Sequence, residues 1–332
     1  MAAVHSLDRI VFTVPDLAAA ERFYAAFGLR TEMADGELAL FTDGNPHCWA
    51  VLHEVRGQPK KLQYLSFGCF EQDFETIAQN AEMHRLKTCE PHPLSRIAGL
   101  SGDLQDAAQS LWLQHPEGFP VQIRPAPKSS PTQKSVASRD PVVPEGRGAA
   151  PNRARVPQVR PRRLSHALFF SGDVAGAVAF YEQALGLRVT DRSSDVIVFM
   201  HGVHGSDHHL LALAKSDGPG LHHLSWDVAS VDQVGMGMEQ MLIAGHERGW
   251  GVGRHVLGSN YFYYVRDPWG SYCEYSFDID FVPYGFDWPS ADHPLEDSFY
   301  VWGPRVPEDF VKNYETTPQH APEVTADEIT PS

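Results

Sequence analysis

The two halves of the chain repeat one ancestral unit, and this duplication constrains the fold more than any other feature of the sequence. The second-half segments SHALFFSGD, LHHLSWD and DPWGSYCE correspond to the first-half segments DRIVFTVPD, LQYLSFG and HPEGFPVQ. Three corresponding pairs place a potential metal ligand opposite a residue that is unsuited to bind a metal, namely His166 and Arg9, His223 and Tyr64, and Glu274 and Gln122. The members of these pairs are 157, 159 and 152 residues apart, which indicates that one copy has kept a metal site and the other has lost it.

The candidate ligand set indicates an enzyme. Two imidazoles and one carboxylate fill about half of the positions around an octahedral metal ion, an arrangement that non-haem Fe(II) oxygenases use to hold substrate and O2 together. A single histidine is usually a surface residue or a hydrogen-bonded core residue, and the chain has 17 histidines. His166 and His223 stand out because each lies at the start of a repeated unit.

The composition indicates a two-domain protein without a nucleic-acid or membrane partner. A length of 332 residues allows two domains, each with its own core. The net charge of −15 argues against nucleic-acid binding, which needs a basic face. Apolar runs fall short of the roughly 18 residues of a membrane span. The four cysteines lack zinc-type spacing, so we expect free thiols and a cytoplasmic location.

Two segments lack the apolar periodicity of a folded domain. Residues 126–163 are rich in Pro, Ser and Arg, and we interpret them as the linker between an N-terminal, non-catalytic domain at 1–125 and a metal-binding domain at 164–280. The basic linker would suit either a nucleic-acid-binding arm or a segment that lies across acidic domain surfaces, and the second interpretation is favoured. Residues 281–312 form a C-terminal segment, and the acidic residues 313–332 are expected to be disordered.

Each half is predicted to contain two strand–helix–strand–strand–strand (βαβββ) units. The run HALFFSGD predicts a strand that ends near Asp173, a good helix N-cap, and apolar residues at helical spacing follow it as far as Gly186, a residue type typical of helix C-termini. The run RIVFTVPD and the residues up to Gly28 repeat this pattern. Further helices are predicted at 74–83 and 231–244. Four such units, paired into two domains, give an α+β fold.

Residues 254–275, RHVLGSNYFYYVRDPWGSYCEY, carry a family resemblance. The DPWG sequence predicts a type I turn. The segment resembles the motif of type I extradiol ring-cleavage dioxygenases, members of the vicinal oxygen chelate superfamily with the glyoxalase/bleomycin resistance/dioxygenase fold. Seven positions agree with the motif: Gly253, His255, Tyr264, Asp267, Pro268, Gly270 and Glu274. The chain departs at Tyr263, where the family usually has an aliphatic residue or Phe, and the resemblance extends over about residues 6–310.

The resemblance implies a metal site and a substrate class. It implies that His166, His223 and Glu274 bind Fe(II), or Mn(II), since ligand sets of oxygen and nitrogen accept both. His222 points to the opposite strand face from His223, and the family uses the second histidine of such a pair. The implied substrates are a catechol-type ring and O2, and the implied product is a 2-hydroxymuconic semialdehyde-type compound.

The resemblance also implies the catalytic residues. His209, 14 residues before His223, lies at the family position of an acid–base histidine, and His208 is the alternative. His255 and Tyr264 match a pair of donors that hydrogen-bonds the metal-bound substrate oxygen. In the family the C-terminal segment folds over the pocket mouth. One of its aromatic residues is therefore expected to shape the pocket: Phe281, Tyr284, Trp288 or Trp302.

Within the family, DSFYVWGP and residues 250–270 are similar to a subgroup that includes metapyrocatechase II and trihydroxytoluene oxygenase. The implied substrate is then a monocyclic or bicyclic catechol, and we expect a homo-oligomer. Two alternatives remain. A glyoxalase-like isomerase or thiol transferase has the same fold but usually builds one metal site from both units of a pair. A ligand-binding protein of this fold would have no metal triad. Neither alternative accounts for the motif at 254–275.

Overall fold

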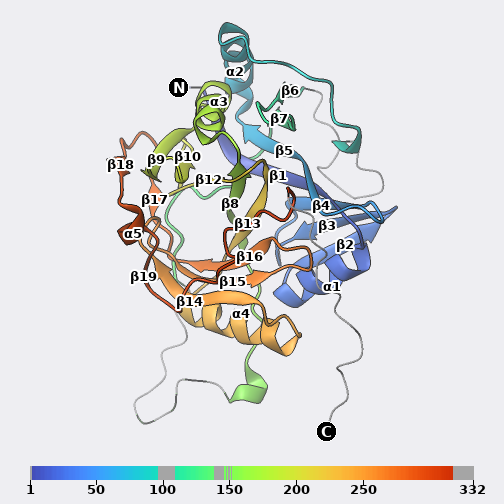
Figure 1. The fold of residues 1–332 in the computed structure, drawn as a ribbon, viewed down its shortest axis with the longest axis vertical. Coiled ribbons are helices and arrows are strands. Elements are labelled where there is room, and N and C mark those ends of the chain that lie inside the picture. Colours follow the sequence, from blue (N-terminus) through green and yellow to red (C-terminus); the bar gives the residue numbers. More distant parts are fainter. Residues whose placement is uncertain are drawn as a thin grey trace.

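Two mixed β-sheets with helices packed against them form the protein (Figure 1). The computed structural model describes residues 2–95, 109–137 and 152–316, together with Gly146, Gly148 and Ala150. The first half of the chain builds one sheet and the second half builds the other, so that the duplication read from the sequence is visible in the architecture. The predicted α+β class is confirmed.

The first half forms a seven-stranded sheet in the order β2-β3-β4-β1-β5-β7-β6. Its two units meet where β1 lies antiparallel to β5, and β5 lies parallel to β7. The strand bounds are β1 Val4–Val14, β2 Arg30–Ala34, β3 Glu37–Phe41, β4 Cys48–Glu54, β5 Lys61–Cys69, β6 Leu111–Gln114 and β7 Pro120–Pro125.

The second half forms a ten-stranded sheet in the order β18-β9-β10-β12-β8-β13-β16-β15-β14-β19. Both edge strands come from the C-terminal segment, and short strands β11 and β17 pair separately. The bounds are β8 Arg163–Ser171, β9 Arg188–Ser193, β10 Ile197–His201, β11 Ser206–Asp207, β12 Leu211–Lys215, β13 Gly220–Asp227, β14 Gly249–His255, β15 Tyr261–Arg266, β16 Tyr272–Phe277, β17 Phe281–Val282, β18 Ala291–Asp292 and β19 Tyr300–Trp302.

The helices begin and end near the predicted residues. Asp173 accepts a hydrogen bond from Gly176 N at the start of α3, and Gly186 closes this helix with a left-handed φ of 69°. The helix predicted at 74–83 starts earlier, at Glu71, because its first turn is acidic and lacks the apolar residues that mark a helix. The bounds are α1 Leu17–Phe27, α2 Glu71–Met83, α3 Val174–Leu185, α4 Val231–Ile243, α5 Leu295–Ser298, and two 3-10 helices, η1 Pro93–Ser95 and η2 Arg153–Arg155.

The predicted units recur, and two of the four differ from the prediction in their number of described strands. The first unit has three strands after its helix, as does the fourth, and the third has an additional short strand, β11. The second unit has two strands after α2 within the described part of the chain, β6 and β7, and residues 96–108 lie outside it.

One hydrophobic core joins the two halves. Phe27, at the end of α1, stacks on Tyr275 of β16 with 3.9 Å between ring centroids, and the Tyr275 hydroxyl donates to the Phe27 carbonyl over 2.8 Å. Gly28 closes α1 directly against the main chain of Val159, so that a side chain has no room there. The sheets are therefore packed together rather than connected only by a linker.

The described parts of the linker lie against acidic residues of both halves. Lys134 Nζ is 2.9 Å from Asp278 Oδ1, and Arg160 Nη1 is 3.2 Å from Asp43 Oδ1. These ion pairs agree with the interpretation of a segment lying across acidic surfaces. Most of residues 138–151, and residues 317–332 of the predicted disordered tail, lie outside the described residues.

Among the described helices, none combines the length and the apolar character needed to cross a membrane. The four cysteines are free thiols, as expected.

Candidate metal centre

The potential metal ligands lie along one row across the second sheet. His166 on β8 pairs with Ser225 on β13, Ser225 pairs with Glu274 on β16, and Glu274 pairs with Tyr264 on β15. Directly paired residues point to the same face of a sheet. His223, two residues before Ser225 on the same strand, points to that face as well. Strand register therefore brings together side chains that are far apart in the sequence.

The first sheet contains the same row with different side chains. Arg9 pairs with Ser66, Ser66 pairs with Gln122, and Tyr64 lies two residues before Ser66. The register thus reproduces the correspondence between halves that the sequence indicated. Within the described ranges, the group of residues close enough together to hold a metal ion consists of the three second-half residues.

The three ligand-type side chains are close together and buried. His166 Nε2 lies 3.3 Å from Glu274 Oε2, and His223 Nε2 lies 3.5 Å from the same oxygen. His223 Nε2 and Glu274 Oε2 are both buried without a hydrogen-bond partner among the described residues. An unsatisfied buried polar group costs about 1–3 kcal/mol. A metal ion bound by these atoms would remove that cost, so the donor set fits Fe(II) or Mn(II).

Burial and neighbouring charges keep His223 and Glu274 in the protonation states that bind a metal. Burial lowers the pKa of His223 well below its usual range, and the imidazoles of His222 and His166 lower it further. Burial alone would raise the pKa of Glu274, but the nearby imidazoles of His166 and His255 outweigh it, and the pKa is lowered. A neutral imidazole and an ionised carboxylate are the forms that bind a metal.

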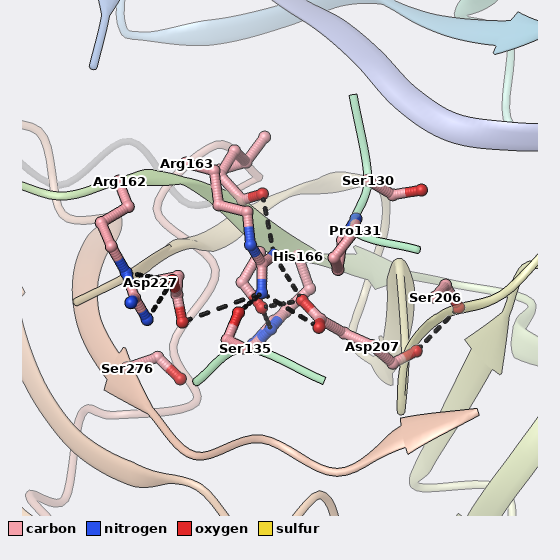
Figure 2. A network of polar contacts seen from close by, with 12 residues as sticks. Ser130, Pro131, Ser135, Arg162, Arg163, His166, Ser206, Asp207, Asp227 and Ser276 are labelled. Atoms are coloured by element: carbon pink, nitrogen blue, oxygen red, sulfur yellow. Dashed lines mark hydrogen bonds and ion pairs between the residues drawn. The ribbon is translucent and has the colours of Figure 1, made fainter. Parts of the chain in front are cut away.

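Hydrogen bonds fix which nitrogen of His166 faces Glu274. The Ser165 hydroxyl donates to Asp207 Oδ2 over 2.7 Å, so it accepts from His166 Nδ1, 3.2 Å away. Nε2 then keeps its lone pair for a metal. Figure 2 shows that Arg163 reaches Asp207, and its guanidinium also approaches Asp227. This ion-pair network holds Asp207 in place, and Asp207 in turn holds the Ser165 hydroxyl that hydrogen-bonds to His166.

His223 is oriented in the same way by its neighbour. His222 Nε2 donates to the Phe310 carbonyl over 2.9 Å, since a carbonyl only accepts. Burial lowers the pKa of His222 to about 4, so its ring is neutral and its Nδ1 accepts from His223 Nδ1, 2.7 Å away. His223 Nε2 is again left with a free lone pair. The sequence-based choice of His223 over His222 agrees with this geometry.

Comparisons with known proteins agree with this site. A model of the Glyoxalase/Bleomycin resistance protein/Dioxygenase superfamily matches residues 163–275. Metapyrocatechase 2 of Cupriavidus necator is 50% identical to the chain over 313 residues, which cover 94% of this chain and 93% of that protein. The chain belongs to the extradiol ring-cleavage dioxygenases of this superfamily.

Solved structures show the same fold for this dioxygenase. The Mn(II)-bound glyoxalase from Novosphingobium aromaticivorans superposes with a TM-score of 0.70 at 22% identity, covering 92% of this chain and 94% of that one. The 2,2',3-trihydroxybiphenyl 1,2-dioxygenase from Sphingomonas wittichii strain RW1 superposes with a TM-score of 0.68 at 17% identity, covering 92% of this chain and 100% of that one.

The dioxygenase places His255 and Tyr264 beside Glu274. His255 Nδ1 donates to the Phe299 carbonyl over 2.9 Å, so Nε2 of the neutral ring accepts from the Tyr264 hydroxyl, also 2.9 Å away. The pair was expected to donate to a substrate oxygen. In this structure the Tyr264 hydrogen is held within the pair, so donation requires the hydroxyl to turn away from His255.

Asn260 is a contact of the site that the sequence did not reveal. Its Nδ2 donates to Glu274 Oε1 over 3.0 Å and to Ser276 Oγ over 2.9 Å. The carboxylate is therefore held by one oxygen while the other faces the two histidines. Asn260 lies inside the motif segment, but the motif places no requirement on that position, so no signal singled it out.

His209 lies beside the ligand row, whereas His208 is turned away from it. The His209 ring is 4.0 Å from the ring of His166 between centroids, and it borders the cavity next to the metal ligands. Burial, together with the charges of His166 and His208, lowers the pKa of His209 well below its usual range. Of the two candidates, His209 therefore has the position from which a substrate can be reached.

A cavity of about 230 Å³ opens onto the metal ligands. Its walls are mainly apolar, and they include residues of the C-terminal segment, as expected. Within that segment, however, the aromatic side chains that line the cavity are Phe299 and Phe310, and not Phe281, Tyr284, Trp288 or Trp302. Tyr284 and Trp302 are exposed, Phe281 lies in the short strand β17, and Trp288 packs against His208. The segment has little periodicity, so the sequence gives no sign of which way these side chains point.

Proposed function

We propose that this dioxygenase cleaves a catechol-type ring next to its two hydroxyl groups, using O2 and a Fe(II) ion held by His166, His223 and Glu274. The observation that carries the proposal is the pair of buried atoms His223 Nε2 and Glu274 Oε2, which lie 3.5 Å apart and have no hydrogen-bond partner in the described part of the chain. Mn(II) suits the same donors. The relative that is 50% identical has a name, metapyrocatechase, that denotes this chemistry, and it supports a role in the breakdown of aromatic compounds.

The metal would supply Lewis acidity and an electronic route between the electron-rich ring and O2. The protein residues supply binding and proton transfer. Phe199, Leu257 and Phe310 form apolar walls that suit an aromatic ring. His209 Nε2, which has no hydrogen bond among the described residues, is placed to take a proton from a substrate hydroxyl and to return it as the ring opens.

His255 and Tyr264 are proposed to orient the substrate. The Tyr264 hydroxyl, fixed by its bond to His255, lies in the same row as Glu274 and lines the cavity. Its remaining lone pair can accept from a substrate hydroxyl, and rotation of its hydrogen makes it a donor to the ionised oxygen. Asn260 keeps Glu274 in place throughout.

Aerobic turnover of catechol tests the proposal. The purified protein with Fe(II) should consume one O2 per catechol and form a yellow semialdehyde, and ¹⁸O2 should label two product oxygens. A metal-free His223→Ala protein is the matched control. A colourless muconate diacid, or a requirement for NADH or 2-oxoglutarate, would overturn the assignment even if iron were present.

A further inference from the structure

Asp191 on β9 accepts several hydrogen bonds and has no role in the mechanism proposed above. Its side chain is 8% exposed. Burial alone would raise the pKa of this carboxyl, but hydrogen bonds from His208 and His293 lower it to about 2, so it is ionised at neutral pH. Four donors reach it: His208 Nε2 at 2.9 Å, His293 Nε2 at 3.0 Å, Ala291 N at 3.0 Å and Trp288 Nε1 at 3.1 Å.

The contact with His208 continues to the cavity. His208 Nδ1 lies 3.0 Å from His209 Nδ1, so that Asp191, His208 and His209 form one chain of hydrogen bonds. The Thr190 hydroxyl holds the His208 main chain by donating to its carbonyl over 2.7 Å. The His208 ring also packs edge-on against Trp288, with 5.3 Å between centroids. His208 is thus fixed from three sides.

The direction of each hydrogen bond follows from the carboxylate at the end of the chain. A carboxylate only accepts, so His208 Nε2 carries a hydrogen. In a neutral His208, Nδ1 is then the acceptor, and His209 Nδ1 must carry the hydrogen between them. The remaining nitrogen of His209, Nε2, is left with a lone pair on the cavity side.

We propose that Asp191 is a positioning residue for ring cleavage, which acts through His208 to hold His209 in the tautomer whose Nε2 can accept a proton. This inference rests on the proposed function, because it concerns how His209 is prepared for its role. The other histidines that face the site are oriented by hydrogen bonds of the same kind. Asp207 ends the chain behind His166, the Phe310 carbonyl ends the one behind His223, and the Phe299 carbonyl binds His255.

Replacement of Asp191 by Asn tests the proposal. An amide can donate as well as accept, so it no longer dictates the tautomer of His208. The kcat for catechol cleavage should fall at least tenfold, toward the range of about 10²–10⁴-fold that general acid–base groups and their orienting carboxylates contribute. The KM and the metal content should stay near wild type. Asp191→Glu, which keeps the carboxylate, should recover part of the lost kcat.

A matched variant separates this role from attachment of the C-terminal segment. His293→Gln weakens the contact between Asp191 and that segment but leaves the bond from His208 intact. It should keep kcat within about twofold of wild type. His208→Phe leaves the three other donors of Asp191 in place and should reproduce the loss of kcat. Because both substitutions break the same series of hydrogen bonds, the double variant with Asp191→Asn should lose no more kcat than either single variant.

The outcomes distinguish the possibilities. Wild-type kcat in Asp191→Asn, or an equal loss in His293→Gln, would overturn the positioning role. A raised KM with unchanged kcat would also overturn it, and would mean that Asp191 serves only to attach the C-terminal segment next to the cavity. If wild-type protein with Fe(II) fails to consume O2 with any catechol, the proposed function is wrong. That result does not depend on any Asp191 variant, so the two failures can be told apart.

Discussion

Four of the histidines that line the cavity, His166, His209, His223 and His255, are oriented in the same way. The Nδ1 atom of each ring begins a series of one or more hydrogen bonds that ends on a carboxylate or carbonyl oxygen, which can only accept. The effect is that Nε2 of each ring carries a lone pair toward the site. For His166 and His223 that lone pair is what a metal needs, and for His209 it is what a proton acceptor needs. The same arrangement therefore prepares metal ligands and a proton acceptor at one site.

The metal ligands and their support are expected to differ in the effect of their removal. His223→Ala and Glu274→Ala should abolish both metal binding and turnover, because each removes one of three donors. His222→Ala removes only the acceptor of His223 Nδ1 and should weaken metal binding by about 10–100-fold without abolishing it. Metal content after gel filtration at saturating Fe(II) measures this. If His222→Ala loses the metal and His223→Ala keeps it, the choice between these residues is wrong.

His209 is expected to affect the reaction and not the binding steps. His209→Gln should leave metal content and catechol affinity close to wild type and should slow the steps that follow O2 mixing by about 10²–10⁴-fold. Stopped-flow absorbance of the catechol complex mixed with O2 reports those steps separately from product release. An unchanged rate would move the proton-transfer role away from His209.

At this scale the sequence predicted the side chains that lie in the site but not what holds them. His166, His223 and Glu274 could be found because the repeated halves differ there. The acceptors at the ends of the chains could not, since two of them are main-chain carbonyls of Phe299 and Phe310, which carry no residue-specific signal. Asp191 is one acid among 42 Asp and Glu residues, and only the fold brings it to His208.

At the scale of elements, the strands of the second sheet determine which residues meet. Glu274 is placed opposite Tyr264 by the turn at Asp267, whose Oδ1 accepts from Trp269 N and Ser271 N over 2.9 and 3.1 Å. The sequence predicted this turn because its residue types are specific. The C-terminal segment was predicted only as a cover, since it lacks periodicity and its strands are two or three residues long.

Helix α4 supplies a test of how closely the elements pack. A Cβ added at Gly237 would lie 2.7 Å from the Tyr275 ring, next to Glu274 in sequence, whereas one at Gly235 would meet nothing within 4 Å. Gly237→Ala should therefore destabilise the protein by about 1–3 kcal/mol. Gly235→Ala should stabilise it by about 0.5–1 kcal/mol through helix propensity alone.

Urea unfolding of both glycine variants beside the wild type measures this difference. Equal stabilisation by the two substitutions would show that Tyr275 can move aside without loss.

At the scale of the whole molecule, the two halves have the same strand register but different chemistry. Arg9 occupies the position of His166, and a guanidinium group offers no lone pair that could bind a metal. We therefore expect one Fe(II) or Mn(II) per chain, bound in the second half. Elemental analysis of protein saturated with metal and then desalted measures the ratio. Two ions per chain that survive desalting would contradict the loss of the first site.

Buried histidines between the halves are expected to make the fold sensitive to acid. Burial lowers the pKa of His115 to about 3, where its ring stacks on Phe119 and contacts Tyr181 of the second half. The unfolded chain takes up this proton below about pH 6.5 and the folded chain does not. Stability from this group is therefore complete above that pH and falls by up to about 1.4 kcal/mol per unit as the pH drops toward 3.

Replacement of His115 isolates that contribution. His115→Phe should lose less stability than wild type between pH 7 and pH 5, by up to about 2 kcal/mol, when urea unfolding is compared at the two values. The exposed His84→Gln should behave like wild type. If His115→Phe keeps the full wild-type dependence on pH, the sensitivity arises elsewhere.

The contacts of the glycines that end α1 and α3 indicate how the two-part chain arose. Gly28 of the first half packs against Val159, just before the second half begins, and Gly186 of the second half packs against Ala3, just before the first sheet begins. The two contacts are reciprocal, as in the isologous interface of a two-fold symmetric dimer. We infer that the ancestral unit was a homodimer whose subunits were later joined end to end. Once joined, one subunit could lose its metal while its contacts continued to support the other.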